Sequence, residues 1–246
     1  MNFFSIIIDT CNHEKWIEKC ITSCINQDYE NFEIIILDAK SDDKTFEICK
    51  EFELKNPKIK VFQNEQRQPQ VINFINLANY SSDKSILVSV DGDDWLKNNS
   101  VLNKLNEIYS SEDVWMTYGT YEEFPYRDVS MFYHEYPKNI VENNDFRNYR
   151  WLSSHLRTFR KELLLKIDLI DLKNENDEWL LTTGDQAIML PMLEMSGFNS
   201  KYVDDILYVY NVSDNSRDTY LNEKKQIEYA NYIRKKNKYK KIEKLY

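Results

Sequence analysis

Three acidic residues within four positions carry the clearest chemical signal in this sequence. Asp91, Asp93 and Asp94 directly follow Ile86–Val90, a run dominated by apolar residues. A strand that ends in carboxylates delivers them to the edge of a sheet, where open α/β folds bind ligands. Acids this close repel one another unless a cation or a hydrogen-bonding ligand joins them. They predict a hard-metal site that faces a phosphate-bearing substrate, and the alternative is an acidic turn that caps the next helix.

The first half of the chain alternates short apolar runs with helical patterns. Buried strands are expected at 3–8, 32–37, 59–62, 86–90 and 114–118, and helices at 14–27, about 42–52, 70–79 and 101–109. Strict alternation indicates βαβ units with a parallel sheet, and continuous apolar strands agree because such a sheet is covered on both faces. We therefore predict a single-domain α/β fold with a mostly parallel central sheet flanked by helices.

Polar residues end three of these strands and should meet at one edge of the sheet. Asp9 and Thr10 end the first strand, Asp38 the second and Asp91 the fourth. Such convergence is what a nucleotide cleft needs. The Asp38 carboxylate can accept a hydrogen bond from a base N–H, such as the one that uracil N3 offers. It can equally cap the following helix, and both interpretations stay open here.

The second half is patterned differently. Residues 121–150 are polar and aromatic without clear periodicity, which is typical of a substrate-facing loop. Helices are expected near 151–167 and 185–195, a strand near 202–210, and a basic C-terminal helix over 219–246. The tail from Lys224 carries nine basic and two acidic residues. It predicts a solvated helix face or, as an alternative, peripheral attachment to an anionic membrane.

Composition excludes several classes of protein. The chain of 246 residues has a net charge of −9, and an acidic body of this kind does not suggest nucleic-acid binding. It lacks GxGxxG and P-loop motifs, a signal peptide and any apolar run of membrane-spanning length. Its cysteines are expected to be buried free thiols, which favours a cytoplasmic location: Cys11, Cys20, Cys24 and Cys49.

Four ordered segments resemble family 2 glycosyltransferases. FSIIIDTCN at 4–12 is similar to the opening strand, EIIILDAKSDDKT at 33–45 to the second strand, VDGDD at 90–94 to the DxD motif, and GDQA at 184–187 to a later acidic motif. The resemblance is good over residues 3–120. It implies a Rossmann-like GT-A fold that transfers a sugar from a nucleotide diphosphate with Mn²⁺ or Mg²⁺. It also implies a nucleotide-sugar-binding half at 1–120 and an acceptor-side half at 121–218.

Residue roles follow from the resemblance, position by position. The residues it assigns to the nucleotide sugar are Thr10, Cys11 (through its backbone), Asp38, Gln70, Asp91 and Gly92. Those it assigns to the metal are Asp93, with Asp91 and Asp94 beside it. Asp185 takes the place of the catalytic base.

Two departures from the family pattern affect these assignments. Asp9 replaces the usual proline, and Ala39-Lys40 replaces two glycines, so the turn after Asp38 is expected to differ. No QxxRW motif follows Asp185, which gives no sign of a processive synthase.

Asp185 also makes chemical sense without the family. Inverting transfer needs a base that takes the proton of the acceptor hydroxyl, and this carboxylate lies far along the chain from the metal acids. It opens a predicted helix, whose N-terminus favours an ionised acid, although acids are common there for that reason alone.

Nearby basic residues leave further alternatives open. Arg157 or Arg160 could contact phosphate, but a surface ion pair is the more ordinary interpretation. The histidines are not grouped in sequence, and a structural role is expected for them. His155 is the exception, because it lies in the predicted acceptor side and could have a functional role there.

The sequence thus predicts a metal-dependent, inverting, non-processive glycosyltransferase with a UDP-sugar donor and a glycan or lipid-linked acceptor. One alternative is a phosphatase of the haloacid-dehalogenase type, although its DxD normally ends the first strand and continues with Thr or Val. Here the motif ends the fourth strand and is followed by Trp95. Another alternative is a non-catalytic nucleotide-sugar binder of the same fold.

Overall fold

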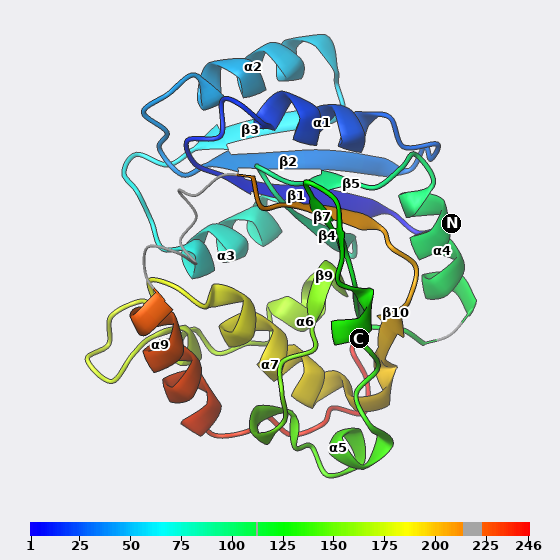
Figure 1. Ribbon diagram of the computed structural model, residues 1–246, viewed down its shortest axis with the longest axis vertical. Helices are drawn as coiled ribbons and strands as arrows, with labels where there is room; N and C mark the ends of the chain where they lie inside the picture. Colours follow the sequence, from blue (N-terminus) through cyan, green and yellow to red (C-terminus); the bar gives the residue numbers. More distant parts are fainter. Residues whose placement is uncertain (112, 214–222) are drawn as a thin grey trace.

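A seven-stranded sheet forms the centre of the protein, as a computed structural model of residues 1–111, 113–213 and 223–246 shows (Figure 1). The strands lie in the order β10-β6-β9-β4-β1-β2-β3. Their bounds are β1 Phe4–Thr10, β2 Phe32–Asp38, β3 Ile59–Gln63, β4 Ile86–Asp91, β6 Met116–Gly119, β9 Ser154–Arg160 and β10 Ser200–Val203. All neighbouring pairs are parallel except those of β9, which is antiparallel to β4 and β6. The predicted mostly parallel sheet is confirmed.

Helices cover both faces of this sheet. Helices α1 (Ile17–Ile25) and α2 (Thr45–Lys55) lie on one face, and α3 (Gln70–Tyr80), α6 (Lys161–Leu164) and α7 (Gly184–Ser196) on the other (Figure 1). The other α-helices of the described residues are α4 (Val101–Ser111), α5 (Lys138–Glu142) and α9 (Glu223–Lys235). Alternate residues of β1 enter the two cores: Ile6 and Ile8 pack with α1, and Ile7 packs with α3.

A second, four-stranded sheet has the order β5-β11-β7-β8. It consists of β5 Trp95–Leu96, β11 Tyr208–Asn211, β7 Glu122–Phe124 and β8 Arg127–Asp128. The single strand expected at 202–210 is therefore two strands, because β10 joins the large sheet and β11 the small one. Part of the expected loop at 121–150 also forms strands. The small sheet matters for function since it brings β11 next to the acidic motif.

The helix predicted near 151–167 is wrong. Residues 154–160 form β9, which lies between β4 and β6, and only Lys161–Leu164 are helical. All residues of β9 except Arg160 are buried. A strand covered on both faces shows no alternation of polar and apolar residues, so its pattern does not distinguish it from a buried helix.

The C-terminal tail is anchored rather than simply solvated. Helix α9 ends at Lys235, earlier than the predicted helix over 219–246, of which 219–222 lie outside the described residues. Arg147 donates to both carboxylate oxygens of Glu194 on α7, at 2.6 and 2.8 Å, and to the carbonyl of Ile233 on α9. The backbone N–H of Tyr239 donates to the same Glu194 carboxylate. This buried ion pair therefore ties the tail to α7.

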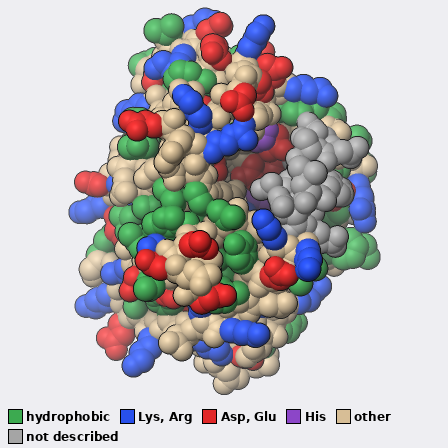
Figure 2. Space-filling view, turned by 90° about the vertical axis from the view of Figure 1, so that its left-hand side faces the viewer, with side chains coloured by type: hydrophobic (Ala, Val, Ile, Leu, Met, Phe, Trp, Pro, Cys, Tyr) green, Lys and Arg blue, Asp and Glu red, His purple; other side chains and the backbone are tan. Residues whose placement is uncertain are grey.

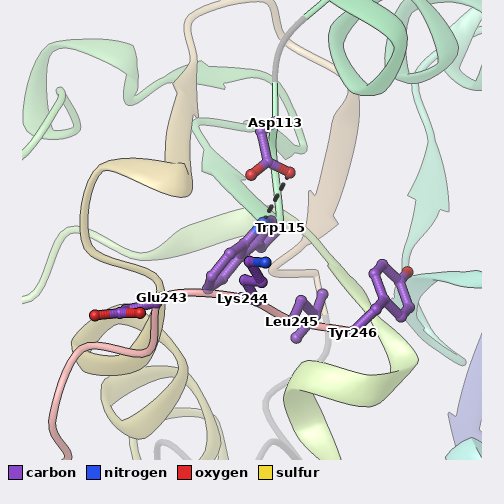
Figure 3. A pocket seen from close by; sticks show the side chains of 6 residues that line it. All are labelled: Asp113, Trp115, Glu243, Lys244, Leu245 and Tyr246. Carbon is purple, nitrogen blue, oxygen red and sulfur yellow. Dashed lines mark hydrogen bonds between the residues drawn. The ribbon is translucent and has the colours of Figure 1, made fainter.

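The last residues lie beside β6. Figure 3 shows the segment Glu243–Tyr246 passing Trp115, whose indole N–H donates to Asp113 at 2.9 Å. Leu245 is buried in the core that also contains α7. Among the helices of the described residues, none has both the length and the apolarity needed to cross a membrane.

Candidate active site

The predicted strand-end residues do meet at one edge of the sheet. In the register of β1 with its neighbours, Thr10 lies opposite Asp38 and Asp9 lies opposite Asp91. Burial, and then the charge of Asp91, raises the pKa of Asp9 to about 7. The side-chain amide of Asn73 donates to Asp9 at 2.9 Å. Negative charge is crowded here, and a cation would relieve it.

Gly92 lets the acidic loop close against β1. Its backbone N–H donates to the carbonyl of Asp9 at 3.0 Å. A Cβ atom on Gly92 would lie 2.3 Å from Thr10 Oγ1 and 2.8 Å from His13 Nδ1. These two side chains share a hydrogen bond of 3.1 Å. Any larger residue at position 92 must therefore displace the Thr10–His13 pair.

Gly92→Ala is expected to destabilise the protein by about 1–3 kcal/mol, the usual cost of overpacking. It should also weaken nucleotide binding, because Thr10 is predicted to contact the base. Urea denaturation and a thermal-shift titration with UDP measure the two effects. An unchanged urea midpoint would show that the loop has room to move.

Asp38 is fully buried and closes the turn after β2. Its carboxylate accepts from Gln63 Nε2 at 2.9 Å, from the backbone N–H of Ser41 at 3.0 Å, and from the Ser41 hydroxyl. Helix α2 begins only at Thr45, so Asp38 closes a turn ahead of the helix rather than capping its first residue. The predicted contact with the base stays a prediction. Cys11 is half-buried rather than buried as expected, and burial raises the pKa of its thiol. Its predicted contact through the backbone stays a prediction.

The replacement of two glycines by Ala39-Lys40 leaves a tight turn. Lys40 adopts a φ of 71°, in the left-handed region where glycine is usual. The backbone N–H of Ala39 donates to the carbonyl of Thr10 at 2.8 Å and so fixes the turn to the end of β1.

A group of three candidate metal ligands lies at the same edge. Oxygen or nitrogen atoms of Asp91, Asp94 and His155 are all within 4.8 Å of one another. Asp94 is fully buried, and it accepts from the Tyr208 hydroxyl at 2.9 Å and the backbone N–H of Asn211 at 2.8 Å. Two carboxylates with one imidazole are a ligand set that suits a divalent ion such as Mn²⁺.

Tyr208 orients this group. Its ring stacks on His155, with centroids 4.4 Å apart and an interplanar angle of 9°. Burial, and then the charge of Asp94, raises the pKa of Tyr208 well above its usual value. The phenol therefore stays protonated and donates to Asp94. Strand β11, which the sequence did not separate from β10, thus positions two of the three candidate ligands.

The group differs from the predicted ligand set. Asp91 and Asp94 belong to it, but Asp93 does not, and its backbone carbonyl accepts from Asn211 Nδ2 at 3.1 Å. A role for Asp93 as a metal ligand stays a prediction. His155 joins the group from a different strand, 61 residues after Asp94. No sequence spacing indicates that contact.

Asp185 lies at the start of α7 and is held by a second residue of β9. Arg157 donates to Asp185 Oδ2 at 3.2 Å and through Nε to the carbonyl of Ser153 at 3.1 Å. Asp185 Oδ1 accepts from the backbone N–H of Gln186 at 2.8 Å. The expected ion pair of Arg157 is confirmed, but it is only partly on the surface, because Arg157 is buried while Asp185 is partly exposed.

Arg160 and Gln70, the other two residues with predicted contacts to the substrate, lie in different parts of the structure. Arg160, the last residue of β9, donates through Nε to the carbonyl of Val114. Gln70, predicted to contact the donor, lies against the start of α7, where a Cβ on Gly184 would be 3.0 Å from its Oε1. Gln70 therefore lies next to the residue that precedes Asp185, and its contact with the donor stays a prediction.

Comparison with known proteins identifies the family. A family model described as "Glycosyl transferase family 2" matches residues 5–168, about two thirds of the chain. The chain belongs to this family. It is 36% identical over 145 residues to the dolichyl N-acetyl-α-D-glucosaminyl phosphate 3-β-D-2,3-diacetamido-2,3-dideoxy-β-D-glucuronosyltransferase of Methanococcus voltae. That match covers 49% of this chain and 45% of the relative.

Solved structures confirm the GT-A type of α/β fold. The 1–349 fragment of S. aureus TarS in complex with UDP-GlcNAc superposes with a TM-score of 0.64 at 20% identity, covering 87% of this chain and 60% of that one. Glucosyl-3-phosphoglycerate synthase from Mycobacterium tuberculosis, in complex with Mn²⁺, UDP and glucosyl-3-phosphoglycerate, gives 0.57 at 16% identity, with 92% and 76% covered. In the sequence comparison, the chain spans less than half of the length of the Methanococcus relative.

Proposed function

We propose that the protein is a glycosyltransferase that moves a sugar, with inversion, from a UDP-sugar to a hydroxyl of a glycan or lipid-linked acceptor. The observation that carries this proposal is the placement of two separate acidic sites by one strand. His155 of β9 joins Asp91 and Asp94, while Arg157, two residues on, holds Asp185. This supplies one site for a charged leaving group and another for a base.

A divalent cation, Mn²⁺ or Mg²⁺, fits the first site. Asp91, Asp94 and His155 would hold it, and Asp93 is the further predicted ligand. A bound cation would neutralise the charge that develops on the departing diphosphate. The Mycobacterium tuberculosis structure, which contains Mn²⁺ and UDP, supports this assignment.

The second site supplies the base. The carboxylate of Asp185 takes the proton of the acceptor hydroxyl while that oxygen forms a bond to the anomeric carbon. The bond from this carbon to the nucleotide diphosphate breaks on the opposite side, so the configuration inverts. Arg157 and the N–H of Gln186 fix the orientation of the carboxylate.

The acceptor class is inferred from a relative. The name of the Methanococcus voltae enzyme specifies a dolichyl-linked sugar phosphate, which supports a lipid-linked acceptor. Family membership supports glycosyl transfer over the phosphatase alternative. A direct test is the release of UDP from a panel of UDP-sugars with and without Mn²⁺, which a non-catalytic binder would not produce.

UDP is expected to bind more tightly than GDP, because Asp38 is predicted to accept from uracil N3–H. Asp38→Asn keeps an oxygen for Ser41 but presents an amide in place of the other acceptor oxygen. It should weaken UDP binding by about 1.5–3 kcal/mol, the scale of a hydrogen bond to a charged group. Calorimetric titration with UDP and GDP gives both affinities.

Ser41→Ala is the matched control for this prediction. It removes the hydroxyl that donates to Asp38 but leaves the carboxylate in place. It should change stability more than UDP affinity. Tighter binding of GDP than of UDP by the unmodified protein would contradict the assignment.

A further inference from the structure

A pocket that the proposed chemistry does not use opens near Asp185. It has a volume of about 400 Å³ and is lined by Pro69, Glu178, Trp179, Leu181 and Tyr229. This volume lies within the roughly 300–1,000 Å³ of small-molecule sites. Trp179 and Tyr229 are partly exposed, so their rings are accessible to a ligand.

The walls of the pocket come from segments that adjoin the start of α7, the helix that carries Asp185. Pro69 immediately precedes α3, and the next residue, Gln70, packs against Gly184 at the start of α7. Leu181 lies four residues before Asp185. The hydroxyl of Thr183 donates to the carbonyl of Gln226 on α9, the helix that supplies Tyr229. The residue before α3, the segment that leads into α7 and one residue of α9 thus form the walls of the pocket.

One face of the molecule is mixed in character. Figure 2 shows hydrophobic side chains gathered on one face, next to a hollow in which acidic and histidine side chains lie. Lysine, arginine and acidic side chains are interspersed around the hydrophobic area in the same view. An anionic membrane surface would favour a uniformly basic rim instead.

The lining residues match the chemistry of a sugar ring. One face of a pyranose presents apolar C–H groups, which pack on aromatic rings, while its hydroxyl groups need acceptors. Trp179 and Tyr229 supply the rings. The carboxylate of Glu178 supplies acceptors and is held by Asn174 Nδ2 at 3.0 Å. Lys173 Nζ lies over the Trp179 ring, 4.9 Å from its centre.

We propose that this pocket binds a pyranose ring of the acceptor, adjacent to the ring whose hydroxyl is attacked. The proposal rests on the proposed function, because the acceptor must reach Asp185. The enzyme would then select an acceptor that already carries at least one sugar. Trp179 and Tyr229 would recognise that sugar.

Saturation-transfer NMR with methyl β-glycosides of glucose, galactose, N-acetylglucosamine and N-acetylgalactosamine tests the proposal. At least one glycoside is expected to receive saturation at its ring protons. Trp179→Ala and Tyr229→Ala should each weaken that binding by about tenfold, as truncation of an aromatic anchor does. Trp179→Phe is the matched control, because it keeps an aromatic face and should retain most of the binding.

Octyl phosphate serves as the competing probe for a lipid chain. Displacement of the glycosides by octyl phosphate, absence of glycoside binding, or binding that persists in both alanine variants would overturn the proposal. Thermal-shift titration with UDP and Mn²⁺ on the same variants should give unchanged affinities. Failure of the proposed transfer reaction would appear in UDP release, whereas failure of this inference would appear only in glycoside binding.

Discussion

Asp91→Asn is expected to abolish sugar transfer and Mn²⁺-dependent nucleotide binding. Asp91 ends β4 at the point where Asp9 lies opposite it, and its carboxylate belongs to the group with Asp94 and His155. The variant keeps the shape of the side chain but removes a charge that a divalent cation needs. We expect a loss of about 10³-fold or more, because metal catalysis is worth several kcal/mol. UDP release at saturating Mn²⁺, and in excess chelator, measures it.

Two further variants distinguish the ligand group seen in the structure from the ligands that the family resemblance predicts. His155→Gln should lower Mn²⁺ affinity if the group seen in the structure holds the ion, and Asp93→Asn should do so if the family assignment holds. Glu107→Gln, an exposed change on α4, controls for loss of an acid elsewhere and should be silent. Undiminished transfer in excess chelator would contradict the proposal that the enzyme depends on a metal.

The sequence predicted those strands and helices whose residue patterns are contained within a short stretch of the chain. Strands β1, β2 and β4 are continuous apolar runs that end in polar residues, and α1 and α3 have helical spacing. The rule that parallel strands share a carboxyl edge then places Asp9, Asp38 and Asp91 together. This edge follows from chain order alone, and so the meeting of these acids was predictable.

The other side of the site depends on contacts that chain order does not specify. Strand β9 was predicted as a helix because burial on both faces removes its alternation of polar and apolar residues. The positions of His155 and Arg157, which lie on this strand, could therefore not be predicted. Strand β11 brings Tyr208 to Asp94 across 114 residues. A residue that completes a site from a neighbouring strand far along the chain, or from a second sheet, leaves no spacing in the sequence to find.

Asp185→Asn is expected to cut turnover by about 10²–10⁴-fold, the usual contribution of a general base. The amide keeps the shape of the side chain, so its oxygen can still accept from Arg157 or from the N–H of Gln186. It cannot take a proton at neutral pH. Asp185 is not part of the group formed by Asp91, Asp94 and His155, so UDP and Mn²⁺ affinities should stay nearly unchanged. Single-turnover measurements at saturating donor give the rate of the chemical step.

Two comparisons make this result specific to the base. Asp168→Asn changes an acid that caps the start of a helical turn outside the site, and it should leave turnover intact. Arg157→Lys keeps a cation beside Asp185 but loses the fixed guanidinium geometry, so it should lower turnover less than Asp185→Asn. If Asp185 removes the proton, the anomeric configuration of the product must be opposite to that of the donor. A product with the donor's configuration, or near-normal turnover of Asp185→Asn, would assign the base to another residue.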